Sequence, residues 1–182
     1  MDEQLEFIKL IASRLDSVNI PYMLTGSMAM AIYSIPRMTR DIDLVMECRL
    51  EDTNRFAELF EADCYVERKS IRDAITNRSM FNIIHNEWII KADFIIRKDE
   101  PYRRLEFERR RSIDVEGCQV QVVSAEDLIL SKLQWAKAAE SDLQLKDAGA
   151  LLKSIKNIDR DYLDKWAASL ELDPMLDQVS GQ

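Results

Sequence analysis

Glycine and proline are scarce in this chain, with four of each in 182 residues. No glycine- or serine-rich run offers a linker, so we expect one domain, or one domain with a small appendage. The three cysteines, Cys48, Cys64 and Cys118, lie far apart and form no CxxC pair. This spacing disfavours a disulfide framework or a zinc knuckle and favours a reducing compartment. His85 is the only histidine; we interpret it as structural, which also disfavours Ser–His–Asp hydrolysis.

Long apolar runs are absent as well. No stretch approaches the roughly 18 residues of a membrane span, and the N-terminal sequence MDEQLEFIKL is acidic and amphipathic, unlike a signal peptide. We therefore expect a cytoplasmic protein with no membrane partner. The net charge of −8 and the pI near 4.8 argue against a protein that coats nucleic acid nonspecifically.

Positive charge is nevertheless concentrated in two segments. The simpler interpretation is that both are solvated faces carrying ion pairs. The alternative is a surface that steers phosphate groups toward a nearby site. The residues are Arg68, Lys69, Arg72 and Arg78 in the first segment, and Arg103, Arg104, Arg109, Arg110 and Arg111 in the second.

The spacing of apolar residues predicts both helices and strands. A helical repeat runs over residues 3–17, and the alternation D-I-D-L-V-M predicts a strand over 41–46. The remaining expectations are helices over 28–33, 50–62 and most of the chain after residue 124, and strands over 22–25, 80–85, 88–96, 113–115 and 120–123.

These elements indicate an α+β (mixed α/β) fold. We expect a mixed sheet flanked by helices over residues 1–123, followed by a C-terminal helical segment over 124–182 that packs on this core. Ser124 is expected to cap the first C-terminal helix, with Asp127 at the partner position of a capping box. The three tryptophans, Trp88, Trp135 and Trp166, are expected to be packing anchors.

Asp41 and Asp43 are two residues apart on an expected strand, so their side chains leave the same face of the sheet. Two nearby carboxylates repel each other unless a cation lies between them, and hard oxygen ligands suit Mg²⁺ or Mn²⁺. Solvent-facing acids on an edge strand would show the same pattern. The pair alone is therefore a weak signal.

Gly26 and Ser27 lie at an expected strand-to-helix junction, shortly before the paired acids. A glycine at that junction lets the backbone approach a ligand, and the helix N-terminus behind it presents N–H groups to an anion. Ser27 would either bind phosphate or simply cap the helix.

Asp93 is the third acid, within the apolar run KADFII at 91–96. Burial of a carboxylate is costly without a partner. That partner would be a metal ion or Lys91, which lies two residues earlier on the same face.

Taken in order, these motifs resemble the polymerase-β-type nucleotidyltransferase superfamily. Gly26-Ser27, thirteen intervening residues and DIDL at 41–44 are similar to its glycine–serine and paired-aspartate signature. The segment RMTRDID at 37–43 resembles the variant of AbiEii-like and related minimal bacterial nucleotidyltransferases, and KAD at 91–93 is similar to the strand that carries their third metal carboxylate.

The resemblance extends into the helical part of the chain. SAEDLILSK at 124–132, followed by Lys146-Asp147, is similar to the helical region after the catalytic sheet in those proteins. Roughly residues 20–155 are covered. By local context alone Lys132 and Asp147 would equally be ion-paired surface positions.

The resemblance implies transfer of an NMP from an NTP with release of pyrophosphate. Gly26 and Ser27 would cradle the β- and γ-phosphates, while Asp41 and Asp43 would hold the Mg²⁺ that bridges the triphosphate. Asp93 would join them in binding a second metal that activates the acceptor hydroxyl. The basic residues implied to pair with the triphosphate are Arg37, Arg40 and Lys132. Each arginine could equally neutralise Asp41 or Asp43 in the empty protein.

The acceptor class stays open among RNA, a protein and a small molecule, and the acidic surface favours the latter two. The resemblance also implies a toxin–antitoxin or phage-defence pair, hence a cognate partner protein. The alternative is a catalytically inactive protein of this fold that binds nucleotide or a partner.

Overall fold

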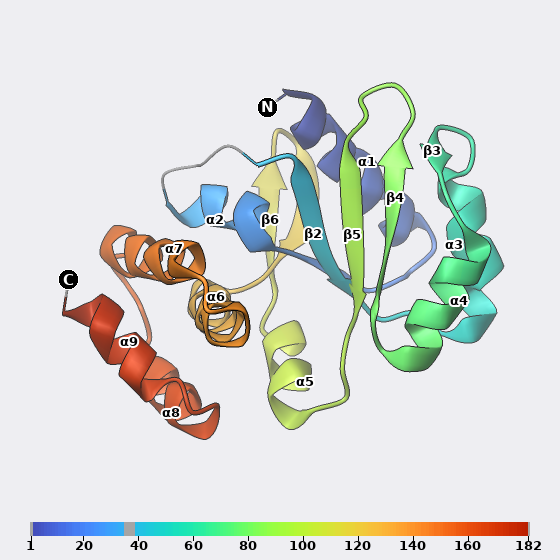
Figure 1. The fold of residues 1–182 in the computed structure, drawn as a ribbon. Helices are drawn as coiled ribbons and strands as arrows, with labels where there is room; N and C mark the ends of the chain where they lie inside the picture. Colours follow the sequence, from blue (N-terminus) through green and yellow to red (C-terminus); the bar gives the residue numbers. More distant parts are fainter. Residues whose placement is uncertain (1, 35–38, 182) are drawn as a thin grey trace. The chain divides into compact units, whose positions relative to one another are not determined.

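The computed structural model describes residues 2–34 and 39–181, in which helices and strands are interspersed up to β7 and only helices follow (Figure 1). The strands are β1 (Tyr22–Thr25), β2 (Asp41–Met46), β3 (Cys64–Tyr65), β4 (Met80–His85), β5 (Lys91–Ile96), β6 (Arg111–Val115) and β7 (Cys118–Val122). The helices are α1 (Asp2–Ser17), α2 (Gly26–Tyr33), η1 (Leu50–Asp52), α3 (Thr53–Phe60), α4 (Arg68–Asn77), α5 (Pro101–Glu108), α6 (Ala125–Ala139), α7 (Asp142–Ser154), α8 (Arg160–Ser169) and α9 (Asp173–Ser180).

The strands that the structure describes form one seven-stranded mixed sheet in the order β3-β4-β5-β2-β1-β7-β6. β2 lies at its centre, parallel to β5 on one side and antiparallel to β1 on the other. β1 and β7 are parallel, whereas β4–β5 and β6–β7 are antiparallel hairpins. The mixed α/β fold expected from the sequence is therefore confirmed, and the two strands that carry the acids are direct neighbours.

A cluster of phenylalanines joins α3 to the sheet. Phe81 of β4 and Phe94 of β5 stack with ring centroids 5.2 Å apart, and Phe56 of α3 meets Phe94 edge-on at 5.1 Å. All three are almost fully buried. Aromatic pairs of this kind contribute about 0.5–1.5 kcal/mol each beyond their burial. The cluster therefore anchors β5, the strand that carries Asp93.

Helix α1 covers the sheet near β7, with its apolar stripe of Phe7, Ile11 and Leu15 fully buried. Arg14 on the same helix donates two hydrogen bonds to the Asp63 carboxylate, at 2.7 and 2.6 Å. These bonds lower the pKa of Asp63. They connect α1 to the residue directly before β3.

The described residues fall into two compact units. The first contains residues 2–28 and 39–123, which include the whole sheet, and the second contains 29–34 and 124–181. Helix α2 thus begins in the first unit, and its later residues belong to the second. The domain limits expected from the sequence, 1–123 and 124–182, stay a prediction, because compactness does not show that either part folds alone.

The second unit is mainly helical: α6 packs on α7 and α8, and α9 packs on α7 and α8. Ser124 caps α6 as expected, because its Oγ accepts a hydrogen bond from the N–H of Asp127 at 3.2 Å. Asp127 is fully buried and also accepts hydrogen bonds from the hydroxyls of Ser124 and Tyr162, both at 2.6 Å. This network ties the first turn of α8 to the first turn of α6.

Several local predictions need correction. The expected helix over 50–62 is a 3₁₀ turn followed by α3, and the expected strand over 88–96 begins only at Lys91, because residues 86–90 form the turn of the hairpin. Helices α4 and α5 and the short strand β3 were not predicted. Trp135 was expected to be a packing anchor, but it is 58% exposed on α6.

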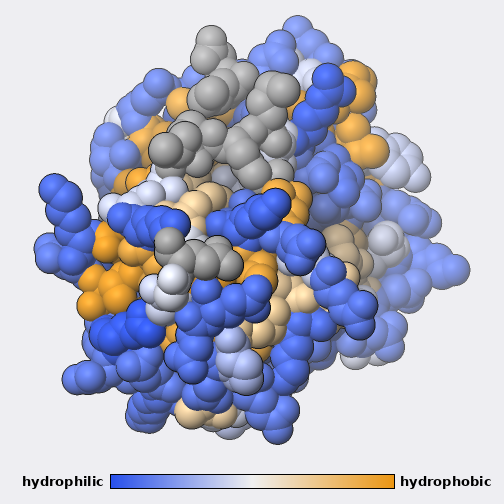
Figure 2. Space-filling model, turned by 60° about the vertical axis from the view of Figure 1, so that its left-hand side comes forward, coloured by the Kyte–Doolittle hydropathy of each residue, from blue (hydrophilic) through white to orange (hydrophobic). Residues whose placement is uncertain are grey.

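Hydrophilic residues cover most of the face shown in Figure 2, with hydrophobic residues gathered in smaller areas. Large exposed apolar side chains include Ile89, Tyr65, Leu50 and Leu143. Within the described ranges, no helix is both long and apolar enough to cross a membrane.

Candidate active site

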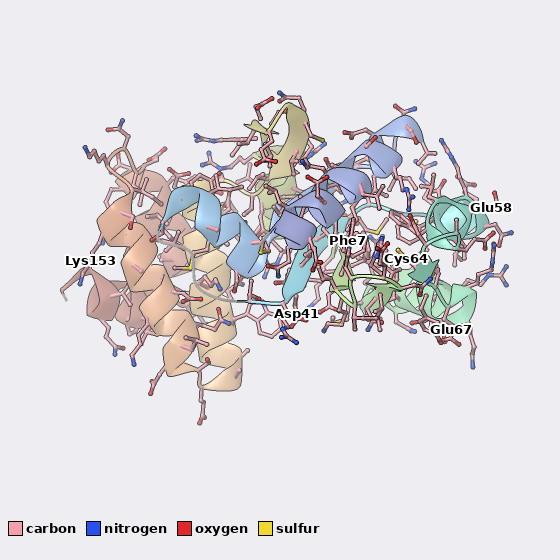
Figure 3. The ribbon with its side chains drawn as sticks, turned by 90° about the horizontal axis from the view of Figure 1, so that it is seen from above. Phe7, Asp41, Glu58, Cys64, Glu67 and Lys153 are labelled. Carbon is pink, nitrogen blue, oxygen red and sulfur yellow. The ribbon has the colours of Figure 1, made fainter. Side chains whose placement is uncertain are left out.

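The register of β2 and β5 places the acidic residues together. Asp43 lies opposite Asp93, and Asp41 lies opposite Lys91. Residues two apart on a strand point to the same face, and parallel neighbours lie about 4.8 Å apart. The four side chains therefore form a quartet on one face of the sheet centre, at the start of β2, where Figure 3 labels Asp41.

Gly26 places the backbone at the end of β1, the strand on the other side of β2, in direct contact with this quartet. It follows β1, whose last residue, Thr25, lies opposite Asp43. A Cβ atom added to Gly26 would lie 2.0 Å from Asp43 Oδ2, and the backbone has φ +65° there. Both the close contact and the left-handed conformation require glycine. The glycine predicted to approach a ligand thus also packs against the central carboxylate.

Asp93 is the most buried acid of the quartet, with 8% of its side chain exposed. Its Oδ2 accepts a hydrogen bond from the Lys91 ammonium at 2.8 Å. Its Oδ1 is buried and has no hydrogen-bond partner among the described residues. Because a buried charged oxygen without a partner is costly, this atom suits a positively charged ligand at the site.

Lys91 contacts two of the three acids. Besides Asp93, its Nζ lies 3.7 Å from Asp41 Oδ1. The hydrogen bond to Asp93 raises the pKa of Lys91 above its ordinary 10.5, so the side chain is an ammonium at neutral pH. The salt bridge considered from the sequence as an alternative partner for Asp93 is therefore present, and it accounts for only one of the two carboxylate oxygens.

The donor set fits a hard divalent cation. Asp43 and Asp93 are neighbouring carboxylates, and the orphaned Oδ1 of Asp93 lacks the positive partner that such a cation would supply. In residues 2–34 and 39–181, no group of three or more His, Cys, Asp or Glu side chains is arranged to hold a metal ion. Phosphate-transfer sites commonly hold Mg²⁺ with one or two carboxylates plus substrate oxygens. Asp43 and Asp93 supply the two carboxylates that such a site needs.

The remaining phosphate-binding candidates occupy different environments. Ser27 follows Gly26 in the first turn of α2 and is buried. Arg40 is exposed directly before β2. Arg37 lies outside the described residues. Ser27 is the neighbour of Gly26 in the chain, and Arg40 is the neighbour of Asp41. Their role in binding phosphate stays a prediction.

Lys132 of α6 is buried in the second unit, where its Nζ lies 2.8 Å from Asp147 Oδ2 of α7. The pair links two helices through residues fifteen apart, and both side chains are almost fully enclosed. It is an internal ion pair, not the exposed surface pair that was one interpretation of the sequence. The assignment of Lys132 to the triphosphate stays a prediction.

The two basic segments carry ion pairs, as in the simpler interpretation of the sequence. Arg103 contacts Glu106 at 2.7 Å, and Arg104 contacts Asp99 at 3.6 Å. Arg68 of α4 pairs with Glu61. Arg68, Arg103 and Arg104 are thus each paired with a nearby acid.

His85 has the structural role expected of it. The ring is 5% exposed and stacks on Trp88 with centroids 3.9 Å apart. Its Nδ1 accepts a hydrogen bond from the backbone N–H of Trp88 at 3.3 Å. These contacts shape the turn before β5.

Sequence reasoning recognised Lys91 as a partner of Asp93 but missed its contact with Asp41. That contact follows from strand pairing, since Asp41 and Lys91 occupy opposite register positions fifty residues apart. The parallel pairing of β2 with β5 is the signal that would have revealed it.

Comparison with known proteins agrees with this fold. A crystal structure of an antigenic nucleotidyltransferase-like protein from Paracoccidioides brasiliensis matches with a TM-score of 0.63 and 18% identity, covering 98% of this chain and 92% of that one. A putative nucleotidyltransferase from Thermotoga maritima matches with a TM-score of 0.56 and 16% identity, covering 80% and 92%. ANT(2")-Ia in complex with adenylyl-2"-tobramycin matches with a TM-score of 0.58 and 14% identity, covering 98% of each chain.

No curated protein matches the chain in sequence. The family model described as "Nucleotidyl transferase AbiEii toxin, Type IV TA system" matches residues 13–168, which is most of the chain. The AbiEii-like resemblance inferred from the motifs is thereby confirmed, and the chain belongs to the AbiEii nucleotidyltransferase toxin family.

Proposed function

We propose that this protein uses a divalent cation, Mg²⁺ or Mn²⁺, to transfer an NMP from an NTP to an acceptor hydroxyl. The observation that carries the proposal is the contact of Gly26 with the Asp43 carboxylate, beside the orphaned oxygen of Asp93. A glycine turn, a helix N-terminus and hard oxygen ligands together suit a metal-bound triphosphate.

Each part of the site has a proposed role. Gly26 and Ser27 present the backbone at the start of α2 to the β- and γ-phosphates. Asp43 and Asp93 hold the cation, and Asp41 at the exposed start of β2 supports it. A bound cation would stabilise the charge that develops on the transferring phosphate. Arg37 and Arg40 are proposed to pair with the triphosphate.

The acceptor is an RNA, a protein or a small molecule. The ANT(2")-Ia complex contains tobramycin that carries an adenylyl group, so a small-molecule acceptor is compatible with a protein of similar fold. The net charge of −8 favours a small-molecule or protein acceptor over RNA. The family's type IV toxin–antitoxin description supports a cognate partner protein.

A transfer assay tests the activity. The protein is incubated with Mg²⁺ and each α-labelled NTP in turn, together with cellular RNA, cellular protein or a panel of hydroxyl-bearing small molecules. We expect one NTP to label one acceptor class, with release of pyrophosphate, and Asp43→Asn to abolish the labelling. Asp73→Asn on exposed α4 changes the charge equally and should label as the wild type does.

Lys91 favours one alternative function specifically, because its ammonium already neutralises part of the acidic quartet. A catalytically inactive protein of this fold would bind nucleotide or a partner through the same face. It would retain NTP binding in the assay mixture while labelling no acceptor and releasing no pyrophosphate. Pyrophosphate release that depends on Asp43 would exclude it.

A further inference from the structure

Two carboxylate oxygens in the quartet face an ammonium, and a third has no hydrogen-bond partner among the described residues. Asp93 Oδ2 and Asp41 Oδ1 face the same ammonium, at 2.8 and 3.7 Å from Lys91 Nζ. Asp93 Oδ1 is buried with no partner in the described part of the chain. The positive charge of Lys91 thus bridges one pair of acids, while the oxygen left over lies on the residue opposite Asp43.

A two-metal site would need both Asp41 and Asp93 to be open to cations. A second cation sharing these carboxylates would have to displace the Lys91 ammonium or bind beside it, and the repulsion between like charges a few ångströms apart opposes that arrangement. With Lys91 included, the quartet carries a formal charge of −2, which one divalent cation neutralises.

We propose that the site holds a single divalent cation on Asp43 and Asp93, and that the Lys91 ammonium, bridging Asp41 and Asp93, takes the place of the second metal. This inference rests on the proposed function, since it concerns the same site. Lys91 is a fixed positive charge supplied by the chain itself. Its positive charge would attract the carboxylates of the quartet and a substrate phosphate bound beside them.

Asp41 is drawn to Lys91 and has 55% of its side chain exposed, whereas Asp43 is held against Gly26. Asp41 and Asp43 thus have different partners although they are two residues apart. Removing the ammonium should free Asp41 and one oxygen of Asp93 for a further cation.

The test counts bound Mn²⁺ by electron paramagnetic resonance, in which free hydrated Mn²⁺ gives the signal that is titrated. The protein is saturated with a non-hydrolysable NTP analogue. We expect the wild type to bind a single Mn²⁺ per chain and Lys91→Met to bind a second. We also expect the first Mn²⁺ to bind Lys91→Met roughly tenfold or more tightly, because a neighbouring positive charge has been removed.

Two controls separate the outcomes. Lys91→Arg keeps a positive charge and should retain the single Mn²⁺, while Lys98→Met removes a lysine from the exposed segment after β5 and should behave as the wild type does. Two Mn²⁺ ions in the wild type, or one in Lys91→Met, would overturn the inference and leave the proposed function standing. A wild-type protein that binds the analogue with no Mn²⁺, or binds no analogue, would contradict both.

Discussion

Gly26 sets the geometry of the site through its backbone, without a side chain. Its Cα lies so close to Asp43 that any Cβ would overlap the carboxylate, and its φ of +65° is a conformation that glycine adopts without strain. The sequence suggested that this glycine allows a phosphate to approach. The structure adds that it also fixes where the Asp43 carboxylate lies, so one residue governs both halves of the proposed metal–triphosphate site.

The variant Gly26→Ala should therefore lose most of its affinity for nucleotide and only part of its free energy of unfolding. The new methyl group would displace the Asp43 carboxylate, and the left-handed conformation would cost about 1–2 kcal/mol. We expect metal-dependent NTP affinity to fall at least about tenfold, measured by calorimetry.

Gly117→Ala is the matched control for this change. Gly117 also has a positive φ, of +84°, but an added Cβ there meets nothing within 4 Å. The unfolding free energy of Gly117→Ala should fall by about 1–2 kcal/mol for the left-handed conformation alone, while its NTP affinity stays at the wild-type value. Equal loss of affinity in both variants would show that the contact between Gly26 and Asp43 has no special role.

Strand pairing explains which features of the site could be predicted from the sequence. The alternation of Asp41 and Asp43 with apolar residues showed that they share a face, because this period is local. The positions of Asp93 and Lys91 opposite them depend on pairing between β2 and β5, which lie some fifty residues apart. Helices α4 and α5 escaped prediction because each is ten residues or shorter and carries four charged residues, which leaves few apolar positions to mark a period.

Helix packing in the second unit depends on a buried acid. Asp127 is fully enclosed in α6 and accepts a hydrogen bond from the Tyr162 hydroxyl of α8 at 2.6 Å. Tyr162→Phe removes that donor, and we expect a loss of about 1–3 kcal/mol in unfolding free energy because a buried carboxylate loses one of its hydrogen bonds. Urea denaturation of the full chain measures the loss.

The control for this variant is Tyr65→Phe. Tyr65 is 60% exposed on β3, so loss of its hydroxyl should change the free energy of unfolding by less than about 0.5 kcal/mol. If the Tyr162 and Tyr65 variants were equally stable, the hydrogen bond to Asp127 would not be holding α8 to α6.

At the scale of the whole molecule, an acidic chain is proposed to bind a polyanionic substrate. The net charge of −8 repels a triphosphate over a distance, and several arginines of the basic segments are already paired with acids. On this proposal the attraction comes from the site itself: a cation on Asp43 and Asp93, the ammonium of Lys91, the start of α2 and the arginines before β2. Nucleotide binding should consequently depend almost entirely on the divalent ion.

The most direct measurement is calorimetric titration of the protein with a non-hydrolysable analogue of each of the four NTPs, in the presence of Mg²⁺ and again with the metal chelated. We predict that at least one analogue binds with Mg²⁺ and not without it, and that Asp43→Asn weakens this binding at least about tenfold while Asp73→Asn leaves it unchanged. Wild-type protein that binds none of the four with Mg²⁺, or an Asp43→Asn variant that binds as tightly as the wild type, would contradict a metal–triphosphate site on these strands.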